Sequence, residues 1–350
     1  MKLIAAMVAY SLISQTPSPF PSEQQALNGW IALWDGTITD WDVESGWKSS
    51  SAGSLLTSGG RGGPRCRLGG GEWKLRTNPN PSKDSSLKII WRQPDGEKIL
   101  GSWNPGEIKQ EVSFQTPAGK SGQIQFEASH LEITSLWYQP MATDDLIEGK
   151  GITHWNLVPG KKSKASITPE GWIRIQDGPG DLQTKETFGD FVAQLTLKTG
   201  GKHLNSGFFF RAIPGEQWQG YEAQIRNEFT PGTERPYILE SFDPKTNQPT
   251  GKLEVKSSAV DYGSGAIYRR MPARSPAASD NEWFTLTVAA CGRTISTWVQ
   301  GRPQAIWVDN RPANANARQG FRAKAGVFGI QGHDPSTLID FRSLRVLSLD

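Results

Sequence analysis

Polar side chains able to hold a polyol lie at alternate positions of a short segment in the second half of the chain. The segment 205–211 reads Asn-Ser-Gly-Phe-Phe-Phe-Arg. Successive side chains of a strand point to opposite faces, so alternation places Asn205, Phe209 and Arg211 on one face and leaves the other face to a core. The segment therefore predicts a strand with one functional face and one packed face.

Two more segments repeat this arrangement. In Tyr-Glu-Ala-Gln-Ile-Arg at 221–226, Glu222 and Gln224 share a face opposite apolar residues. Near the end of the chain, Gln331 and His333 share a face in Ile-Gln-Gly-His. If the three strands are neighbours, one sheet face carries amides, an arginine, a carboxylate and an imidazole together.

That combination of side chains is typical of carbohydrate binding. Bidentate amide and charged groups take adjacent sugar hydroxyls, and an aromatic ring supports the apolar side of the sugar. The alternative is an ordinary solvated sheet face. Such a face usually carries Lys, Glu, Thr and Ser instead, so the pattern favours a sugar site.

The elements that must position these residues are strands throughout. Glycine (38) and proline (23) are plentiful, and no segment has a sustained helical period of apolar residues. Short alternating or apolar runs separated by Gly, Pro, Asn and Asp predict a β-sandwich or barrel. The strands expected are at 86–92, 111–115, 123–127, 131–138, 172–175, 191–198, 207–212, 221–226, 284–289, 294–299, 325–331 and 341–347.

The two halves of the chain begin alike. Leu33-Trp34-Asp35-Gly36 leads to Trp41, and a similar run from Leu146 leads to Trp155 with one inserted residue. An apolar pair, an acid, a glycine turn and a tryptophan predict an opening hairpin in each half. We place a boundary within 140–145 and expect a sandwich domain at 28–140 and a larger one at 146–350.

The first 22 residues are typical of a signal peptide with a proline-rich lead. Lys2 precedes a short apolar run, and Pro17, Pro19 and Pro21 follow. The run is too short to span a bilayer as a mature helix, and no other segment approaches that length. We expect export to the periplasm or medium, without membrane insertion after the signal is removed. The alternative is an apolar, unstructured N-terminus.

Charge and cysteine content narrow the other possibilities. The net charge is +3 with acids and bases interspersed, so the sequence predicts no nucleic-acid partner. Cys66 and Cys291 are the only cysteines, one in each half, and we expect two buried thiols rather than a disulfide joining the domains. The four histidines are scattered, so no metal-ligand spacing is evident, no cofactor is predicted and a divalent metal is left open.

The second half resembles the DUF1080 family, also called the 3-keto-disaccharide hydrolase domain. The resemblance covers about 146–350 and implies a concanavalin-like lectin/glucanase fold, hence two jelly-roll sandwiches in tandem. The opening of the first half resembles the start of the same family. The matching pieces occur in family order at Asn205–Arg211, Gly220–Ile225, Gly265–Tyr268, Asn281–Phe284, Gly329–His333 and Phe341–Leu344.

The chain departs from the family pattern at one position. Family members usually carry an acid shortly after the Gln that corresponds to Gln224, where this chain has Arg226 and Asn227. The departure puts catalysis or metal binding in doubt.

The resemblance implies a carbohydrate-active hydrolase or lyase acting on 3-keto-glycosides. A 3-keto group acidifies the C2 proton, so the glycosidic oxygen can leave through an enolate before water adds. We assign the base to His333 or Glu222 and the enolate partner to Arg211. The predicted substrate-binding residues are Asn205, Phe209, Gln224, Tyr268 and Gln331.

Simpler alternatives stand beside this hypothesis. A non-catalytic lectin-like protein could use the same fold, and so could a protein-interaction domain of laminin-G style. Arg211 and Glu222 could form a cross-strand ion pair, and His333 could be a surface loop residue. Phe209 and Tyr268 could each be core residues.

Overall fold

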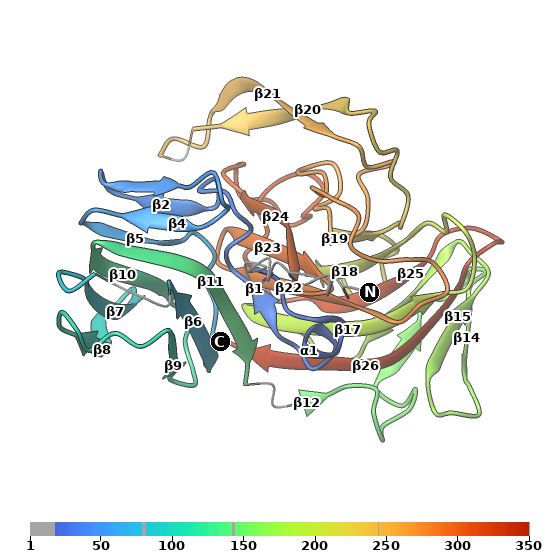
Figure 1. The fold of residues 1–350 in the computed structure, drawn as a ribbon. Coiled ribbons are helices and arrows are strands. Elements are labelled where there is room, and N and C mark those ends of the chain that lie inside the picture. The colour runs from blue at the N-terminus through green and yellow to red at the C-terminus, as the bar shows by residue number, and fades with distance from the viewer. Residues whose placement is uncertain (1–17, 79–81, 142–143, 244, 350) are drawn as a thin grey trace, which may run out of the picture.

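The computed structural model describes residues 18–78, 82–141, 144–243 and 245–349, and within them the chain is built from antiparallel sheets (Figure 1). The predicted all-β class is confirmed. A short helix, α1 (Glu23–Leu27), begins at Ser22, whose side chain and that of Gln25 cap each other's backbone N–H groups. The predicted signal sequence lies mostly at 1–17, outside the described residues.

The first half forms two sheets. The six-stranded sheet has the order β3-β4-β11-β6-β9 with β1 beside β11, and the five-stranded sheet has the order β2-β5-β10-β7-β8. The bounds are β1 Ile31–Ala32, β2 Trp41–Val43, β3 Trp47–Ser49, β4 Leu55–Thr57, β5 Arg61–Pro64, β6 Gly71–Thr77, β7 Ser86–Gln93, β8 Gly96–Trp103, β9 Glu111–Thr116, β10 Gln123–Ser129 and β11 Leu131–Pro140.

The second half forms a larger pair of sheets and a ribbon. The eight-stranded sheet has the order β14-β15-β26-β17-β22-β23-β24 with β12 beside β26, and the five-stranded sheet has the order β13-β16-β25-β18-β19. The bounds are β12 Asp144–Asp145, β13 Trp155–Leu157, β14 Lys164–Ile167, β15 Ile173–Gln176, β16 Gly180–Thr184, β17 Phe191–Thr199, β18 Ser206–Ala212, β19 Tyr221–Ile225, β20 Arg235–Phe242, β21 Pro249–Ser257, β22 Phe284–Cys291, β23 Thr294–Val299, β24 Arg302–Val308, β25 Val327–Gly332 and β26 Leu338–Ser348.

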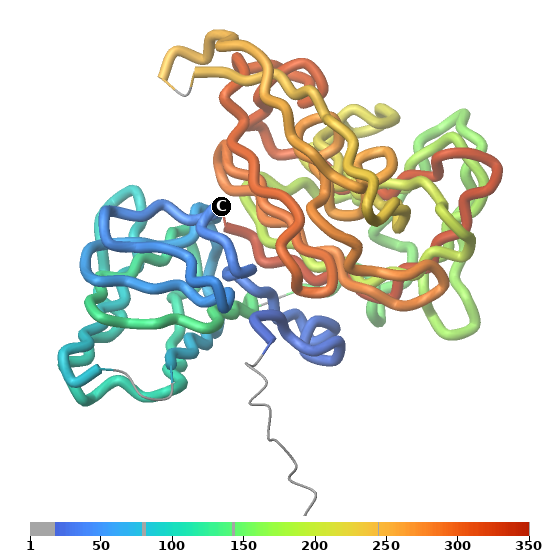
Figure 2. The backbone as a smooth tube through the Cα atoms, turned by 45° about the horizontal axis from the view of Figure 1, so that its top comes forward, coloured from blue at the N-terminus to red at the C-terminus, as the bar shows by residue number. Residues whose placement is uncertain are grey.

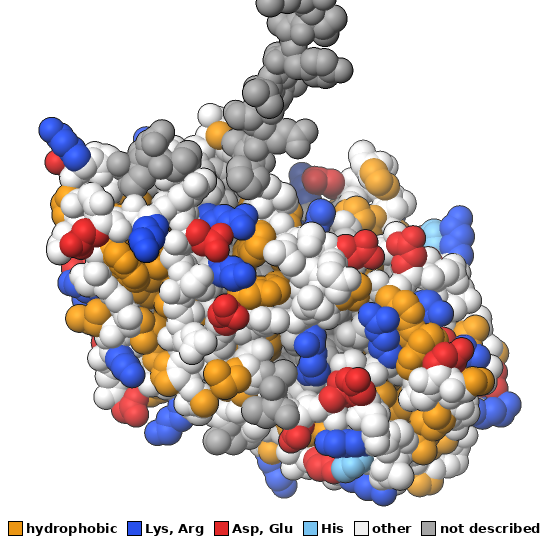
Figure 3. All heavy atoms as spheres, turned by 60° about the horizontal axis from the view of Figure 1, so that its bottom comes forward, with side chains coloured by type: hydrophobic (Ala, Val, Ile, Leu, Met, Phe, Trp, Pro, Cys, Tyr) orange, Lys and Arg blue, Asp and Glu red, His pale blue; other side chains and the backbone are white. Residues whose placement is uncertain are grey.

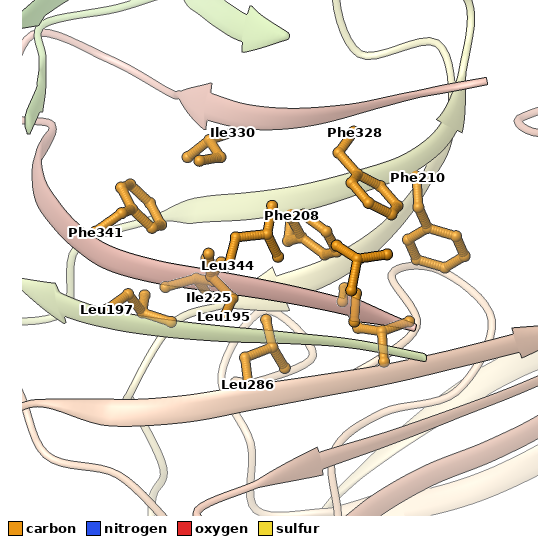
Figure 4. Packing of buried hydrophobic residues seen from close by; sticks show 14 of the residues in the cluster. Leu195, Leu197, Phe208, Phe210, Ile225, Leu286, Phe328, Ile330, Phe341 and Leu344 are labelled. Carbon is orange, nitrogen blue, oxygen red and sulfur yellow. The ribbon is translucent and has the colours of Figure 1, made fainter. Parts of the chain in front are cut away.

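The core of the second half lies between its two sheets. Figure 4 shows Phe208 and Phe210 of β18 pointing toward leucines of β17 and β26. Alternate residues of each strand supply this layer, which is why the apolar residues recur with a period of two. Burial of these side chains is the main favourable contribution to folding of this half.

The two halves lie side by side (Figure 2) and share a buried layer. The indole of Trp298 is buried and its Nε1 donates to the backbone oxygen of Ala32 at 2.8 Å. Arg274 bridges to Asp35 at 2.8 Å and to Asp40 at 2.5 Å. Each sheet draws its strands from one half, while the independence of the two halves as domains stays a prediction.

The predicted opening hairpins are wrong. In each half the first strand of the repeated motif belongs to one sheet and the second strand to the other. Gly36 and Gly149 have positive φ angles of 95° and 70°, and the chain turns there to cross from sheet to sheet. The motif is therefore a crossing between the layers of the sandwich.

Both cysteines are buried and free, as predicted. Burial raises the pKa of each thiol, and that of Cys291 reaches about 12. The Sγ atom of Cys291 lies 3.2 Å from the backbone oxygen of Arg67, so the thiol contributes to the contact between the halves. They are inert at neutral pH in the buried state.

The surface is mixed in charge. On the face in Figure 3, acidic and basic side chains are interspersed among polar ones. In the described part of the chain, no helix is long and apolar enough to cross a membrane.

Candidate functional site

A polar cavity of about 460 Å³ opens on the outer face of the five-stranded sheet of the second half. It contains all the predicted site residues except Arg211 and Phe209. Its lining residues are Asn205, Trp218, Gln219, Glu222, Gln224, Tyr268, Arg269, Arg318, Gln331 and His333. The three strands that alternation pointed to, β18, β19 and β25, are indeed neighbours.

Glu222 owes its position to a glycine on the neighbouring strand. Gly207 of β18 pairs with Gln224 of β19, and Glu222 lies two residues before Gln224 on the same face of the strand. A Cβ at position 207 would lie 2.5 Å from Oε1 of Glu222. The side chain of Glu222 therefore folds over the sheet in space that only glycine leaves open.

Two buried acids lie here: Glu222 lines the cavity, and Asp181 is fully buried outside the lining, where it accepts from the backbone N–H of Trp218 at 2.8 Å. The pKa of Glu222 is raised from 4.5 to about 7, because burial raises it more than Arg318 lowers it, and the charge of Asp181 adds to the rise. Burial likewise raises the pKa of Asp181 from 3.8 to about 7. A carboxyl group that titrates near neutral pH can donate or accept a proton during catalysis. Asp181 supplies the second carboxyl group that the sequence did not reveal.

His333 is oriented by its neighbour in sequence. Its Nδ1 lies 2.9 Å from Oδ2 of Asp334. Hydrogen bonds to Asp334, first from Ser336 and then from His333, hold the pKa of Asp334 below its ordinary value. An ionised Asp334 accepts from Nδ1–H, which leaves Nε2 as an acceptor. That Nε2 lies 3.4 Å from Nδ2 of Asn205, and the ring is stacked on Trp218 at 6.0 Å. The arrangement holds the ring with Nδ1 at Asp334 and Nε2 at Asn205, at the cavity wall.

The amide side chains have free acceptor atoms. Oε1 of Gln224 and Oε1 of Gln331 are buried and find no hydrogen-bond partner among the described residues. A buried acceptor without a partner costs about 1–3 kcal/mol, so a ligand hydroxyl that reaches it is favoured. Both side chains line the cavity, although these two oxygens are themselves shielded from solvent.

A third carboxylate enters from the excursion between β19 and β22. Oδ2 of Asp261 accepts from Nδ2 of Asn205 at 2.9 Å, and the Asp261 backbone oxygen accepts from Nε2 of Gln224 at 2.9 Å. Asp261 and Tyr262 have positive φ angles of 48° and 71°, so the backbone is held in a conformation that these residues rarely adopt. Asp261 fixes the amide orientations.

Arg226 and Asn227 stand where family members usually carry an acid, and both bind other side chains of the protein. Nε of Arg226 donates to Glu228 at 2.9 Å, and a further guanidinium nitrogen lies 3.9 Å from Asp261. The side-chain oxygen of Asn227 accepts from Ser264 at 2.6 Å. The carboxylate next to Gln224 therefore comes from Asp261, 37 residues further along the chain.

The prediction for Arg211 is wrong. The register of β18 against β25 shifts between Phe209 and Ala212, and Arg211 has a positive φ angle of 45°. This bulge turns the side chain away from the cavity, so that it is 1% exposed and pairs with Asp190 at 2.6 Å. Its remaining donors bind backbone oxygens, including that of Gly189 at 2.9 Å. Arg211 does not pair with Glu222 and does not line the cavity.

Phe209 lies on the predicted face but not in the cavity. It is fully buried under Trp218 and packs with Ala212 and Val327. The guanidinium of Arg318 covers its ring at 5.2 Å. Its predicted role in stacking on a sugar is therefore not met, and Trp218 occupies the position between Phe209 and the cavity. Tyr268, by contrast, lines the cavity.

Arg318 and Trp218 are two further site residues that were not predicted from the sequence. Nη2 of Arg318 donates to Glu222 at 2.8 Å and its Nε donates to the backbone oxygen of Trp218 at 2.9 Å. The loop that carries Arg318 is fastened by Arg311, which pairs with buried Asp309 at 2.8 Å. Trp218 precedes the Gly-Tyr-Glu segment by two residues, and that proximity could have predicted it as a site residue. No sequence pattern around Arg318 indicates a role in the site.

Other candidate sites are weaker. A hollow of about 360 Å³ beside α1 is lined by Glu23 and Glu282, which are exposed, and by Trp283, and so it offers no desolvated acid. Within the described ranges, no three His, Cys, Asp or Glu side chains gather as a metal site would require.

The fold and the cavity define a β-sandwich protein with a carbohydrate-related function. A family model described as the 3-keto-alpha-glucoside-1,2-lyase-like domain matches residues 142–347, and the chain belongs to this family.

Solved structures similar to this chain include proteins from two bacteria. Two crystal structures of provisionally assigned glycosyl hydrolases of Parabacteroides distasonis are 18% and 20% identical to it, with TM-scores of 0.41 and 0.42. Each match covers 59% of this chain, and 93% and 98% of the respective structures. A carbohydrate-binding module, CBM66 of Bacillus subtilis, is 15% identical, covering 56% of this chain and 96% of the module, with a TM-score of 0.35. No curated protein matches the chain.

Proposed function

We propose that the protein cleaves glycosides that carry a keto group at C3. Elimination removes the acidic C2 proton, forms the C1–C2 double bond through an enolate, and breaks the bond between C1 and the glycosidic oxygen. The leaving oxygen takes a proton, and water then adds across the double bond. The reaction requires a base near C2, a donor near the keto oxygen and an acid near the leaving group.

The base is His333 in this proposal. With Nδ1 held by Asp334 at 2.9 Å, Nε2 would accept the C2 proton in place of its 3.4 Å contact with Asn205. The imidazolium that forms is stabilised by the adjacent carboxylate. Asn205, at 3.4 Å from Nε2, would hold a substrate hydroxyl beside the base.

The acid is Glu222, and Arg318 takes the role first expected of Arg211. A pKa of about 7 keeps much of Glu222 protonated at neutral pH, so it can donate to the leaving oxygen. The guanidinium of Arg318 lies at the cavity wall beside it and can stabilise charge developing on the enolate. The side chains of Gln224 and Gln331, which line the cavity, would bind sugar hydroxyls.

The observation that carries the proposal is the pairing of a buried, neutral-pH acid with an oriented histidine in one polar cavity. The test is product release from a 3-keto-disaccharide and a 3-keto-β-glucoside beside their unoxidised parents, with and without added divalent metal. Release from the keto sugars alone is expected. Glu222→Gln and His333→Gln should each abolish it while sugar binding remains.

Lectin-like binding without turnover is the second candidate. It is favoured by the amide side chains of Gln224 and Gln331 at the cavity wall, which suit a bound sugar whether or not it reacts. Two results together would support this candidate over the enzyme: the keto sugars bind saturably without product release, and the same is seen in Glu222→Gln.

We also propose that the protein is exported. Lys2 and the apolar run that follows it, with the prolines up to Pro21, support this proposal. Expression with and without residues 1–22, followed by fractionation of cells and medium, tests it. Retention of the full chain inside the cell would contradict it.

A further inference from the structure

The two halves of the chain are built on the same strand order. The five-stranded sheets read β2-β5-β10-β7-β8 and β13-β16-β25-β18-β19, so each strand of the first has a counterpart at the same place in the second. The larger sheets correspond as well, from β3-β4-β11-β6-β9 to β14-β15-β26-β17-β22, with β1 and β12 each paired at the side. The first half is therefore a second copy of the sandwich that holds the site.

A tryptophan in each half fixes which residues correspond. Trp41 begins β2 and its Nε1 donates to the backbone oxygen of Leu33 at 2.9 Å. Trp155 begins β13 and its Nε1 donates to the backbone oxygen of Leu146 at 3.2 Å. The same residue type makes the same bond at the same place, so positions can be counted from it in both sheets.

Residues that are paired in register across neighbouring strands form one row on each five-stranded sheet, and the two rows can be compared position by position. Val43 pairs with Gly62 as Leu157 pairs with Leu182, so the preceding residues Arg61 and Asp181 correspond. Asp181 pairs with Gln331, and since Phe208 pairs with Ile330, Gly207 lies beside Gln331 and pairs in turn with Gln224. The corresponding row in the first half is Arg61, Glu127, Lys88 and Ser102.

The pair beyond this row confirms the correspondence. Two residues further along the same strands, Asn205 and His333 correspond to Ser86 and Ser129. Asn205 and His333 contact each other at 3.4 Å, and the hydroxyls of Ser86 and Ser129 do so at 2.8 Å.

A second cavity lies at this corresponding position. Its volume is about 370 Å³, and its lining is Gly60, Ser86, Leu87, Lys88, Ser102, Trp103, Asn104, Glu127, Ala128 and Ser129. The side chains of four of these residues are those that correspond to Asn205, Gly207, Gln331 and His333. The copy has therefore kept a hollow where the second half has its site.

The chemistry of the second cavity is that of binding without proton transfer. Nζ of Lys88 lies 2.7 Å from Glu127, giving a donor and an acceptor side by side, and serine hydroxyls flank them. Trp103 supplies a half-buried ring at the cavity wall. No histidine and no fully buried carboxyl group is among the lining residues, so the acid and base of the first site have no counterpart.

We propose that the first half holds a second, non-catalytic carbohydrate-binding site in this cavity. Vicinal hydroxyls of a neutral sugar would bridge Lys88 and Glu127, and the ring of Trp103 would contact the apolar side of the sugar. A purely solvated ion pair on a sheet face would need neither the hollow nor the aromatic wall. This site does not depend on turnover at Glu222.

Fluorine NMR of the full chain labelled with 5-fluorotryptophan reports on both cavities at once. Trp103→Phe and Trp218→Phe assign the two signals by their disappearance. The probes are cellotetraose, laminaritetraose, maltotetraose and xylotetraose, titrated singly. We expect a saturable shift of the Trp103 signal with at least one probe, in the wild type and in Glu222→Gln alike.

Lys88→Ala is expected to weaken that binding about tenfold or more. Lys98→Ala, an equal change of charge on the adjacent strand outside the cavity, should leave it unchanged. The other tryptophan signals show that both variants are folded. A Trp103 signal that no probe moves, or one that moves equally in Lys88→Ala, overturns the proposal. The Trp218 signal and keto-sugar turnover report the first site separately, so failure there does not count against the second.

Discussion

Nη2 of Arg318 donates a hydrogen bond to Oε2 of Glu222 at 2.8 Å, although 96 residues separate the two in the chain. The contact holds an acid that burial would otherwise keep protonated to a higher pH, because the positive charge favours the ionised form. The balance between burial and this one arginine sets the pKa of Glu222 near neutrality. Several properties of the protein depend on it.

Replacing Arg318 should raise the pKa of Glu222. Arg318→Ala removes the charge that lowers it, so the carboxyl should titrate above pH 7, which carbon NMR of labelled glutamate side chains would measure. Turnover of the keto sugar should fall by about 10²-fold with the loss of charge stabilisation. Arg269→Ala removes an exposed arginine at the same cavity and should change the titration little. An unmoved titration in Arg318→Ala would contradict this account.

Burial of Glu222 should make the free energy of unfolding fall as the pH rises. Its pKa is raised in the folded state, so its contribution is fully present below pH 4.5 and is lost as the pH rises to about 7. Glu222→Gln should flatten that part of the profile by about 3 kcal/mol. Urea unfolding at intervals from pH 4 to about 8 measures it.

The matched control for this profile is Glu216→Gln, which changes an exposed glutamate on the loop before β19. It should leave the slope unchanged. A slope equal in Glu222→Gln and the wild type would show that Glu222 is not desolvated as described. Asp181, with a similarly raised pKa, should leave a residual slope in both.

Removing the carboxylate beside His333 should slow turnover. In Asp334→Ala the Nδ1 contact at 2.9 Å is lost, and the ring is free to take the wrong tautomer. We expect kcat for the 3-keto-disaccharide to fall about 10²-fold with a small change in KM. Asp243→Ala, in the turn after β20, should have no such effect. Wild-type turnover in Asp334→Ala would exclude His333 as the oriented base.

Arg211 should matter for stability and not for chemistry. Arg211→Met breaks the buried pair with Asp190 and should lower the free energy of unfolding by about 3 kcal/mol. The folded fraction should keep the wild-type kcat/KM, since the side chain lies outside the cavity. Denaturant unfolding and initial rates on the same samples check both parts. A lower kcat/KM in fully folded Arg211→Met protein would contradict this prediction and indicate that Arg211 takes part in catalysis.

The buried layer between the halves should make them unfold together. Trp298 is buried there and donates to Ala32, so Trp298→Ala should cost about 3–5 kcal/mol. We expect calorimetry to show one transition for the wild type and two for the variant, because each half keeps its own core. Trp283→Ala, which alters a half-buried ring away from this layer, should leave a single transition. Two transitions in the wild type would show that the halves are already uncoupled.

Side-chain facing along the expected strands followed from the sequence alone, whereas strands such as β16 and β24 were not expected. Alternation along β19 and β25 placed Glu222, Gln224, Gln331 and His333 on one face, and the structure brings them to one cavity. Such predictions succeed because the two-residue period of a strand is a local property of the backbone. The all-β class followed for the same reason, from many short runs between turns.

The tertiary structure decided what local patterns do not encode. A bulge next to Phe209 turned Arg211 into the interior, which alternation cannot anticipate because one extra residue reverses every later side chain. Asp181 and Arg318 reached Glu222 from distant segments, and the burial of Glu222 together with their opposing charges set the pKa of that acid to about 7. The sequence by itself determined which side chains were available on each strand. The packing of distant strands and loops decided which of them meet and in what protonation state, because burial and long-range charge depend on the whole fold.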